Sequence, residues 1–516
     1  MKKLPISKSV FQEIRNEDLC YVDKTSFVRQ LLDDHSKYWF LARPRRFGKT
    51  LFLDTLRAAF AGEEKLFRGL FLENNWDWDI KYPVVNISFA SGTIESKEEL
   101  KQTLREILDV KAEQYDVIFE KETLSGRFEE LIRKLFEKYK SGVVILVDEY
   151  DKPLLDNITK EAADDIREGL TSFYSVLKDA DRYIKFVFLT GVSKFSKTSI
   201  FSKLNNLTDI SLDPDYGNIC GYTQEDLETV FKEYLKGLNL QEIREWYDGY
   251  NFLGDNLYNP YDVLLYLDNK VFKSYWFETG TPSFLLEVFK KKQYFLPNLY
   301  NIELSDSQMG EFDINHIELD ALLYQTGYLT IKKMHILGDD IYYSLFFPNK
   351  EVRKGLNDYL LRMFFANGAD AANKTKLSQQ IYKALYSNTP KLLEKAFFSF
   401  FAQIPYAWYI KNNIANYEGY YCSVFYAFFV ALGLEIIPED ITNKGRIDFT
   451  ILMDKTIFIF EIKLKSNPGN ALEQIKKKKY HEKYIAEDKK IFLIGIEFDE
   501  GKKNLSMFET RTIDQF

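Results

Sequence analysis

Two acidic residues and a lysine lie among strand-forming residues in the stretch GRIDFTILMDKTIFIFEIKLK, residues 445–465. Asp448 enters one apolar run, and Glu461 and Lys463 lie two positions apart in the next run. Residues i and i+2 of a strand point to the same face, so the carboxylate and the ammonium should converge. Two carboxylates beside a lysine could form one wall of a metal site that acts on a phosphate. The alternative is an ordinary hairpin whose charges form an ion pair on a solvated sheet face.

The apolar residues around this pair favour a sheet that is covered on both faces. Ile457 and Ile459 share the face of Glu461, and the other face carries Phe458, Phe460, Ile462 and Leu464. A strand with apolar residues on both faces is expected to be buried on both. The alternative, an ion pair between Glu461 and Lys463 on a solvated face, would also not explain the presence of Asp448.

A second charged constellation lies upstream, in KYWFLARPRRFGKTLFLDTLRAAFAG, residues 37–62. Residues 38–41 are predicted to form a buried strand, and apolar residues recur with helical spacing over 53–60. A turn from a strand into a helix can cradle phosphate, because main-chain N–H groups and the helix N-terminus face the anion. Gly48, Lys49 and Thr50 match the GK[ST] end of the P-loop pattern, with Lys49 placed for the β- and γ-phosphates and Thr50 for Mg²⁺. Arg43 replaces the first glycine of that pattern, so a basic surface turn is the alternative.

Two further predicted strands end in polar residues. The aliphatic run 143–147 is followed by Asp148, predicted to hold Mg²⁺, and by Glu149, predicted to polarise the attacking water. The run in YIKFVFLTGVSKFS ends in Thr190 and Gly191, which suits a polar sensor of the γ-phosphate. Helical segments separate these strands, and YPVVNISFA supplies another, so we expect an α/β core with a parallel sheet. The residues predicted to bind the nucleotide are Arg45, Arg46, Phe47, Gly48, Lys49, Thr50, Leu51, Asp148 and Thr190.

Length and composition bound the class of protein. A chain of 516 residues is expected to form two to four domains, and 46% hydrophobic with 16% aromatic residues indicates well-filled cores. The longest uncharged apolar run, 419–434, is shorter than the roughly 20 residues of a membrane span. The N-terminal residues lack the apolar segment of a secretory signal, so a cytoplasmic location without a membrane partner is predicted. The net charge of −8 means that nucleic acid would need a local basic surface.

Cysteine and histidine usage argues against other kinds of site. Cys20, Cys220 and Cys422 are too scattered for a disulfide framework or a zinc cluster, and the four histidines are scattered as well. A reducing compartment fits this usage best.

Many motifs along the chain together resemble a known family. They include YVDKTSFVRQLL, RPRRFGKTLFLDTL, VILVDEYDKPL, LTGVSKFSKTSIFSKLNNLTDIS, WYDGYNF, YNPYDVLLYL, YWFETGTPSFLLE, LLYQTGYLTI and FPNKEVR. In this order they look like the AAA-ATPase-like proteins common in anaerobic bacteria, whose C-terminus is often a PD-(D/E)XK nuclease-superfamily domain. The family usually has the loop RPRRFGK[TS], so Arg43 departs from the general P-loop but not from these relatives. The resemblance covers nearly the whole chain and implies ATP binding.

The resemblance also suggests how the charges at 445–465 are used. A PD-(D/E)XK site places an acid on one strand and [DE]-x-K on the next, which Asp448, Glu461 and Lys463 match. The helix predicted over residues 416–433 carries Glu418 near its start, where the superfamily often has a further metal-binding acid. Gln474 matches a helical position that is often glutamine. We expect Glu418, Asp448 and Glu461 to bind Mg²⁺ or Mn²⁺. The other catalytic residues are expected to be Lys463, which addresses the scissile phosphate or the nucleophilic water, and Gln474.

The region between the two predicted sites is interpreted mainly as architecture. Residues 216–300 are predicted to form a helical lid, in which Asn259 and Tyr261 could face the nucleotide, although packing within the lid is favoured. Residues 318–365 have the order helix, strand, Gly-Asp-Asp turn, strand, helix, which suggests a winged helix. Such domains bind DNA or pack against the nucleotide domain, and the second role is favoured.

The predicted domains are an AAA-like ATPase core at 1–215, the lid at 216–300, a winged-helix-like and helical connector at 301–395 and the nuclease-like domain at 396–516. The predicted function is Mg²⁺-dependent ATP hydrolysis that regulates access of DNA to a metal-dependent nuclease site. The alternative is a regulatory ATPase scaffold whose inactive nuclease-like domain binds a partner. A homo-oligomer is possible in either case, and the lysines at 476–479 could follow a phosphate backbone or form a solvated helix face.

Overall fold

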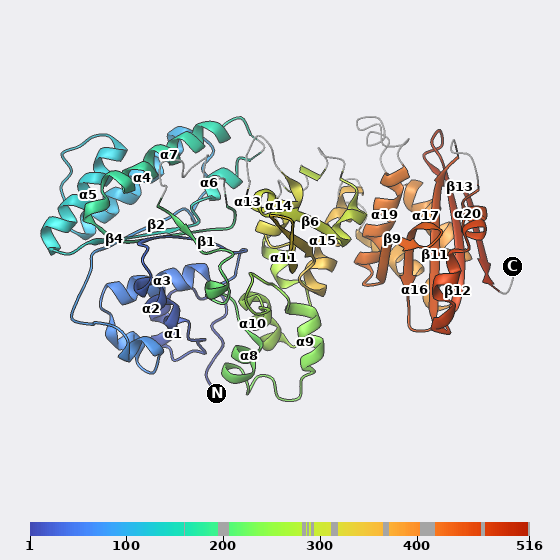
Figure 1. Cartoon of the computed structure of the whole chain (residues 1–516), viewed down its shortest axis with the longest axis horizontal. Coiled ribbons are helices and arrows are strands. Elements are labelled where there is room, and N and C mark those ends of the chain that lie inside the picture. The colour runs from blue at the N-terminus through green and yellow to red at the C-terminus, as the bar shows by residue number, and fades with distance from the viewer. Residues whose placement is uncertain are drawn as a thin grey trace. The chain divides into compact units, whose positions relative to one another are not determined.

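The computed structural model describes residues 1–158, 160–194, 206–280, 285, 288–289, 294–310, 318–364, 371–402, 418–465 and 470–513 (Figure 1). The chain divides into two compact units. Unit 1 comprises Met1–Val288 and Ile302–Asn349, and unit 2 comprises Phe289–Asn301 and Lys350–Phe516. The finer division into four domains stays a prediction.

Unit 1 is built on a parallel sheet with the strand order β2-β3-β4-β1-β5. The strands are β1 (Tyr38–Ala42), β2 (Val84–Ser88), β3 (Val143–Asp148), β4 (Ile184–Gly191) and β5 (Thr208–Asp209). Every residue of β3 is buried, as expected for a strand in the middle of a parallel sheet that is covered on both faces. The carboxyl ends of parallel strands meet at one edge, so the loop that follows β1 and the polar residues near the ends of β3 and β4 are brought together.

Helices cover both faces of this sheet. Figure 1 shows α1 (Phe11–Asn16), α2 (Thr25–Asp33) and α3 (Lys49–Phe60) on one side, and α4 (Lys97–Gln114), α5 (Leu124–Tyr139) and α7 (Ala163–Asp179) on the other. The short α6 (Lys152–Leu155) follows β3. Single turns of 3₁₀-helix occur at η1 (Glu64–Phe67), η2 (Phe71–Asn74), η3 (Asp181–Tyr183) and η4 (Pro214–Tyr216).

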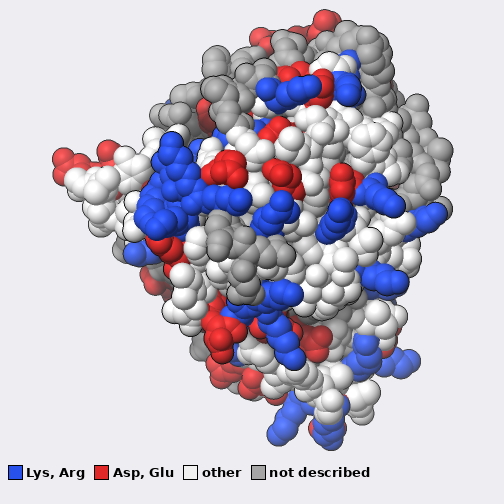
Figure 2. All heavy atoms as spheres, turned by 90° about the vertical axis from the view of Figure 1, so that its right-hand side faces the viewer, with Lys and Arg blue, Asp and Glu red and all other residues white. Residues whose placement is uncertain are grey.

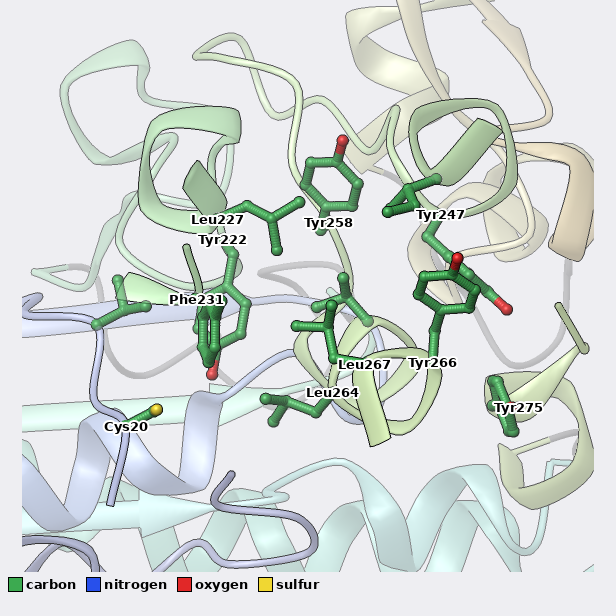
Figure 3. Close-up of a cluster of buried hydrophobic side chains, with 13 residues drawn as sticks. Cys20, Tyr222, Leu227, Phe231, Tyr247, Tyr258, Leu264, Tyr266, Leu267 and Tyr275 are labelled. Carbon is green, nitrogen blue, oxygen red and sulfur yellow. The ribbon is translucent and has the colours of Figure 1, made fainter. Parts of the chain in front are cut away.

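The segment predicted to be a lid forms a cluster of short helices with an aromatic core in unit 1, and the name lid is kept for it below. Its helices are α8 (Gln224–Val230), α9 (Leu240–Tyr247), α10 (Pro260–Asn269) and α11 (Tyr275–Gly280). The buried side chains drawn in Figure 3 are Cys20, Val22, Tyr222, Leu227, Phe231, Ile243, Tyr247, Tyr258, Val263, Leu264, Tyr266, Leu267 and Tyr275. Since Cys20 and Val22 belong to this cluster, the N-terminal segment packs into the lid.

A small antiparallel sheet completes unit 1. Its order is β6-β8-β7, with β6 (Ile302–Ser305), β7 (Thr330–Leu337) and β8 (Asp340–Phe346). The helices α13 (Asp306–Gly310) and α14 (Leu319–Gln325) precede β7, and Gly338, at φ +66°, lies in the turn between β7 and β8. The predicted order of helix, strand, turn and strand is present, and the helix that follows, α15 (Lys350–Phe364), is assigned to unit 2.

Unit 2 is a five-stranded sheet with helices. The sheet order is β13-β12-β11-β10-β9, in which only the β11 and β12 pair is parallel. The strands are β9 (Glu435–Thr442), β10 (Gly445–Leu452), β11 (Thr456–Leu464), β12 (Lys490–Asp499) and β13 (Asn504–Thr512). The remaining elements are η5 (Leu296–Tyr300), α16 (Ala371–Tyr386), α17 (Lys391–Ala402), α19 (Glu418–Ala431), α20 (Ala471–Lys478) and η7 (Tyr480–Glu487).

Both faces of the central strands of unit 2 are covered, as their alternation predicts. Ile457 and Ile459 of β11 join a buried cluster with Leu472 and Ile475 of α20. On the opposite face, the Phe460 ring contacts Phe429 of α19, with the ring centroids 5.5 Å apart. Glu461 and Lys463 therefore extend from a strand that is buried on both sides. Within the described part of the chain, no helix is long and apolar enough to cross a membrane.

Candidate functional site

The loop between β1 and α3 has the main-chain conformation of a tight anion-binding turn. Gly48 is the N-cap of α3 and has φ +94°, and Arg46 also has a positive φ of +62°. A φ in this region strains a side chain that carries a Cβ, which explains the glycine at 48. Because α3 begins directly after this turn, its first N–H groups point out of the helix end and are available to phosphate oxygens.

Lys49 is buried and bound to the loop itself. Its ammonium donates hydrogen bonds to the carbonyl oxygens of Arg43 and Pro44, both at 2.8 Å. Burial lowers the pKa of Lys49, although the charges of Asp148 and Glu149 act in the opposite direction. The ammonium is thus held at the loop, where phosphate oxygens could replace the carbonyl oxygens as its acceptors.

Asp148 joins the three elements that meet at this edge of the sheet. The hydroxyl of Thr50 on α3 donates to one carboxylate oxygen of Asp148, and the hydroxyl of Thr190 on β4 donates to the other, each at 2.7 Å. The N–H of Glu149 also donates to the oxygen bound by Thr190, at 3.1 Å. Asp148 is only 3% exposed, so these three donors largely determine how its carboxylate is oriented. The predicted metal ligands Thr50 and Asp148 and the predicted sensor Thr190 are therefore in direct contact.

Glu149 follows β3 with a positive φ of +53°. Burial raises the pKa of its carboxyl group, and the charges of Lys49 and Arg45 oppose this shift. These interactions place Glu149 in the same electrostatic environment as the loop. Its role beside the attacking water stays a prediction.

Arg43 and Phe47 point their side chains into packing interactions. The Arg43 guanidinium is 1% exposed, donates to the carbonyl oxygens of Ser211 and Tyr216 at 2.8 and 3.1 Å, and lies 4.1 Å from the ring centroid of Phe252. The buried Phe47 ring packs against Tyr250 and Phe252. Arg43 therefore fastens the start of the loop from within, and only the main chain of Phe47 is placed to serve the predicted nucleotide contact.

The lid contacts the loop through polar groups. The indole N–H of Trp276 and the amide of Asn259 both donate to the carbonyl oxygen of Arg45, at 3.1 and 3.4 Å. The Arg46 guanidinium lies 5.2 Å from the ring centroid of Tyr261. Asn259 and Tyr261 thus contact the loop, contrary to the expectation that they pack only within the lid.

In unit 2, the five predicted site residues come from four elements and lie together. Glu461 and Lys463 lie on β11, Asp448 on β10, Glu418 at the start of α19 and Gln474 on α20. The Lys463 ammonium is 3.7 Å from a carboxylate oxygen of Glu461 and 4.0 Å from one of Glu418. The Gln474 amide donates to Glu461, and the Ile462 N–H donates to Asp448 at 2.6 Å. The helices and strands expected from the sequence therefore bring these side chains to one place.

Comparisons with known proteins match both units. Residues 5–201 match a family described as predicted AAA-ATPase, and residues 416–508 match the PD-(D/E)XK nuclease superfamily. A protein of Azotobacter chroococcum mcd 1, described as an uncharacterized protein in the vnfD 5′ region, is 44% identical over 516 residues that cover 99% of each chain. The chain belongs to the AAA-ATPase-like family with a PD-(D/E)XK domain. The resemblance expected from the motifs and the α/β fold class are confirmed.

The carboxylates of this PD-(D/E)XK domain have the chemistry of a cation site. Burial raises the pKa values of Glu461 and Asp448 well above the usual carboxyl range. The negative charge of Glu418 raises both pKa values further, and the charge of Asp448 also raises that of Glu461. One oxygen of Glu461 is buried and has no hydrogen-bond partner among the residues that the structure describes. A divalent cation would supply the missing partner and offset the buried negative charge.

The present arrangement is not itself a finished ligand shell. Among the described residues, no three His, Cys, Asp or Glu side chains are grouped as a metal-binding cluster. Gln474 and the N–H of Ile462 occupy carboxylate oxygens of Glu461 and Asp448. Metal binding would therefore exchange at least part of this hydrogen bonding for coordination.

One buried acid of this AAA-ATPase-like protein was missed by reasoning from strand ends. Asp151 is 1% exposed and accepts hydrogen bonds from the N–H groups of Val192 and Ser193 and from the Ser193 hydroxyl. It thereby ties the segment after β3 to the segment after β4. The signal available in the sequence is its position three residues after Asp148, in the same DEYD motif.

Proposed function

We propose that unit 1 hydrolyses ATP and that the nucleotide state regulates cleavage of DNA by unit 2. The observation that carries the first half is the pair of hydrogen bonds from Thr50 and Thr190 to Asp148, which joins the phosphate loop to two strand ends. This arrangement supports the binding of a nucleoside triphosphate with Mg²⁺. The match to a nuclease superfamily supports the second half.

In the ATPase site, each residue is assigned one task. The main chain of the loop and Lys49 bind the phosphates, and Asp148 and Thr50 are the residues that would hold Mg²⁺, which neutralises phosphate charge when bound. Thr190 fixes the orientation of Asp148 through its 2.7 Å hydrogen bond. Glu149 takes the proton of the attacking water.

In the nuclease site, Asp448 and Glu461 are the residues that would hold Mg²⁺ or Mn²⁺, with Glu418 as a further acid. The bound cation would polarise a phosphodiester and lower the pKa of a water nucleophile. Lys463 lies 3.7 Å from Glu461, close enough to bind the scissile phosphate beside that carboxylate. Gln474 orients Glu461 through its hydrogen bond.

A second candidate function is a regulatory ATPase scaffold whose PD-(D/E)XK domain binds a partner without cleaving DNA. A specific observation favours it: within the described residues the acidic side chains are not grouped as a metal cluster. The basic side chains of unit 2 are also interspersed with acidic ones on the face shown in Figure 2. In the run at 476–479, Lys476 is paired with Glu473 at 3.3 Å and Lys479 with Glu482 at 3.8 Å.

The test compares cleavage of plasmid DNA and of linear single-stranded DNA with Mg²⁺ or Mn²⁺, with and without ATP. The proteins are the wild type, Lys463→Ala and Lys49→Ala. We expect Lys463→Ala to abolish cleavage while ATP hydrolysis persists, and Lys49→Ala to abolish hydrolysis and to change the dependence of cleavage on ATP. Hydrolysis of ATP without cleavage under any condition would favour the scaffold function. Cleavage that is the same with and without ATP in all active proteins would refute the regulation.

A further inference from the structure

The phosphate loop contains a guanidinium that the fold does not use. Arg45 is partly buried in the middle of the loop, and its side chain makes no hydrogen bond or ion pair with any residue that the structure describes. An arginine at a phosphate-binding loop offers five N–H donors in a fork that matches phosphate oxygens. An unused guanidinium at this position is therefore a candidate ligand for the nucleotide.

The other basic side chains around this edge of the sheet already have partners. Lys49 is bonded to loop carbonyl oxygens, Arg43 to the carbonyl oxygens of Ser211 and Tyr216, and Arg46 lies over Tyr261. Lys194 forms an ion pair with Asp209 at 2.6 Å, and Lys152 donates to the carbonyl oxygen of Gly92. Within the described part of the chain, Arg45 is therefore the cation of this loop that could bind a phosphate without giving up an existing contact, whereas Lys49 would exchange its carbonyl acceptors for phosphate oxygens.

The main chain of Arg45 is held more firmly than its side chain. Its carbonyl oxygen receives hydrogen bonds from Trp276 at 3.1 Å and from Asn259 at 3.4 Å, and the residue after it has a left-handed φ. The Cα position is thus determined by the lid, whereas the guanidinium can adjust to a ligand. Substituting the side chain should leave both hydrogen bonds in place, because they end on the main chain.

Arg45 and the predicted base lie at the same edge of the sheet. Arg45 is three residues after the end of β1, and Glu149 directly follows β3, in a sheet whose strands are parallel. The base that activates the attacking water must lie beside the γ-phosphate. A loop side chain at this edge of the sheet is therefore placed to reach the same phosphate.

We propose that Arg45 contacts the γ-phosphate and stabilises the charge that develops during hydrolysis, so that one chain holds a complete ATPase site. This inference rests on the proposed ATP hydrolysis. In the step, the water oxygen forms a bond to the γ-phosphorus while the bond from this phosphorus to the β–γ bridging oxygen breaks, and the electron pair leaves with ADP. Glu149 takes the proton of the water, and Arg45 donates hydrogen bonds without transferring a proton.

The proposal separates this protein from ATPases in which a neighbouring subunit supplies the arginine. A site completed within one chain predicts a specific ATPase activity that does not depend on protein concentration. A site completed by a partner predicts activity that falls as the protein is diluted below the dissociation constant of the oligomer. A homo-oligomer could still form, but it would not be needed for hydrolysis.

The first experiment measures kcat for ATP hydrolysis and the affinity for a fluorescent ADP analogue in the wild type, Arg45→Ala and Arg45→Lys. We expect Arg45→Ala to lower kcat about a thousandfold, as for arginine fingers that act in cis, and to change the ADP affinity by less than about threefold. Arg45→Lys should recover only a small part of the rate, because an ammonium lacks the planar fork. The matched control is Arg133→Ala, which removes an exposed arginine that is paired with Glu137 on α5.

The second experiment mixes Arg45→Ala with Lys49→Ala. If the arginine acts within its own chain, each variant lacks one essential group and the mixture stays inactive. Recovery of activity in the mixture would overturn the proposal, because an intact loop in one chain would then be served by Arg45 of another. Full activity of Arg45→Ala, or equal losses of kcat and ADP affinity, would overturn it as well.

A failure of the proposed function is distinguishable from these outcomes. If the wild type binds the nucleotide but does not hydrolyse it, ATP hydrolysis itself is refuted, and the role of Arg45 falls with it. If the wild type hydrolyses ATP and Arg45→Ala does too, only the proposal fails. Equal thermal unfolding midpoints of Arg45→Ala and the wild type would establish that the fold is intact.

Discussion

Three groups donate hydrogen bonds to the Asp148 carboxylate: the Thr190 hydroxyl and the Glu149 N–H to one oxygen, and the Thr50 hydroxyl to the other. The two hydroxyls are not equivalent. Thr190 is buried in β4, whereas Thr50 is exposed at the start of α3. A bound Mg²⁺ would take over the Thr50 hydroxyl as a ligand, but the hydroxyl of Thr190 can continue to orient the carboxylate. The rate of hydrolysis should therefore depend on Thr190, although its hydroxyl contacts Asp148 and not the nucleotide itself.

We predict that Thr190→Val lowers kcat for ATP hydrolysis about 10- to 100-fold. The buried carboxylate oxygen would keep only the 3.1 Å hydrogen bond from the Glu149 N–H, and the loss of its hydroxyl donor costs roughly 1–3 kcal/mol. The affinity for ATP should change by less than threefold, since the loop and Lys49 are untouched. Steady-state kinetics and a binding titration separate the two quantities. Thr190→Ser is the control and should retain most of the rate. Unchanged kcat in Thr190→Val would rule out this role of the hydroxyl.

At the scale of elements, the lid positions the loop through hydrogen bonds to main-chain atoms. Trp276 of α11 donates to the Arg45 carbonyl oxygen, and the amide N–H of Trp276 in turn donates to buried Asp262 at 2.7 Å. The main-chain hydrogen bond to Asp262 fixes the position of Trp276, and the indole hydrogen bond to Arg45 then fixes the loop. The position of α11 therefore influences the position of the residues that would bind the phosphates.

We predict that Trp276→Phe weakens ATP binding about fivefold, which is the effect of one lost neutral hydrogen bond of about 1 kcal/mol. The matched control is Trp78→Phe, which removes a comparable indole hydrogen bond to the carbonyl oxygen of Glu73, a residue outside the loop. Isothermal titration with ATP and Mg²⁺ measures the two affinities. Equal weakening in both variants would mean that the loss comes from general destabilisation.

Helix α5 is stabilised by a buried carboxylate that belongs to neither candidate site. Glu130 is 4% exposed, accepts the N–H groups of Glu120 and Lys121 at 2.9 and 3.0 Å, and pairs with Lys134 at 2.8 Å. Burial by itself raises the pKa of Glu130, but the Lys134 ammonium and the two N–H groups hold it at about 2. The folded-state pKa therefore lies below the ordinary value of 4.5.

This shift gives the stabilisation a definite pH dependence. A carboxyl group with a lowered folded-state pKa stabilises the fold above pH 4.5 and loses this contribution as the pH falls towards 2. We predict that Glu130→Gln lowers the free energy of unfolding by roughly 1–3 kcal/mol at pH 7 and by less at pH 3.5. Urea unfolding at the two pH values measures the difference. Glu120→Gln alters an exposed partner of the same lysine and should stay within about 0.5 kcal/mol. A loss in Glu130→Gln that is larger at pH 3.5 than at pH 7 would contradict the account.

At the scale of the whole molecule, each compact unit contains its own candidate site. The residues of the phosphate loop and both hydroxyls on Asp148 belong to unit 1, and the carboxylates around Glu461 belong to unit 2. Each ligand should then stabilise the unit that binds it, whether or not the other site is intact.

We predict two separable ligand effects in thermal unfolding. ATP with Mg²⁺ should raise the midpoint of the wild type and of Glu461→Gln but not of Lys49→Ala. Mn²⁺ without nucleotide should raise the midpoint of the wild type and of Lys49→Ala but not of Glu461→Gln. A ligand at about 100 times its Kd adds about 2.7 kcal/mol to the stability of the state it binds, which is ample for detection. Loss of the Mn²⁺ effect in Lys49→Ala would place the measured ion in unit 1 instead.

The sequence by itself determined the class of fold and most of both candidate sites. Local patterns suffice for this, because a run such as 143–147 must be a buried strand and the acids at its end must then lie at the edge of the sheet. The same holds for Glu461 and Lys463, whose spacing of two on a strand puts them on one face. Glu418 and Gln474 were found through the resemblance to a family and not through any local pattern.

Only the tertiary structure decided which side chains are already used. Arg43, Arg45 and Arg46 look alike in the sequence, but Arg43 is buried against carbonyl oxygens, Arg46 lies over Tyr261, and the Arg45 guanidinium is left for a ligand. The hydrogen bonds that the N–H groups of Val192 and Ser193 donate to buried Asp151 could not be predicted from the sequence either. The physical reason is that hydrogen bonds and burial join residues more than 40, or even 160, positions apart, which no local periodicity encodes.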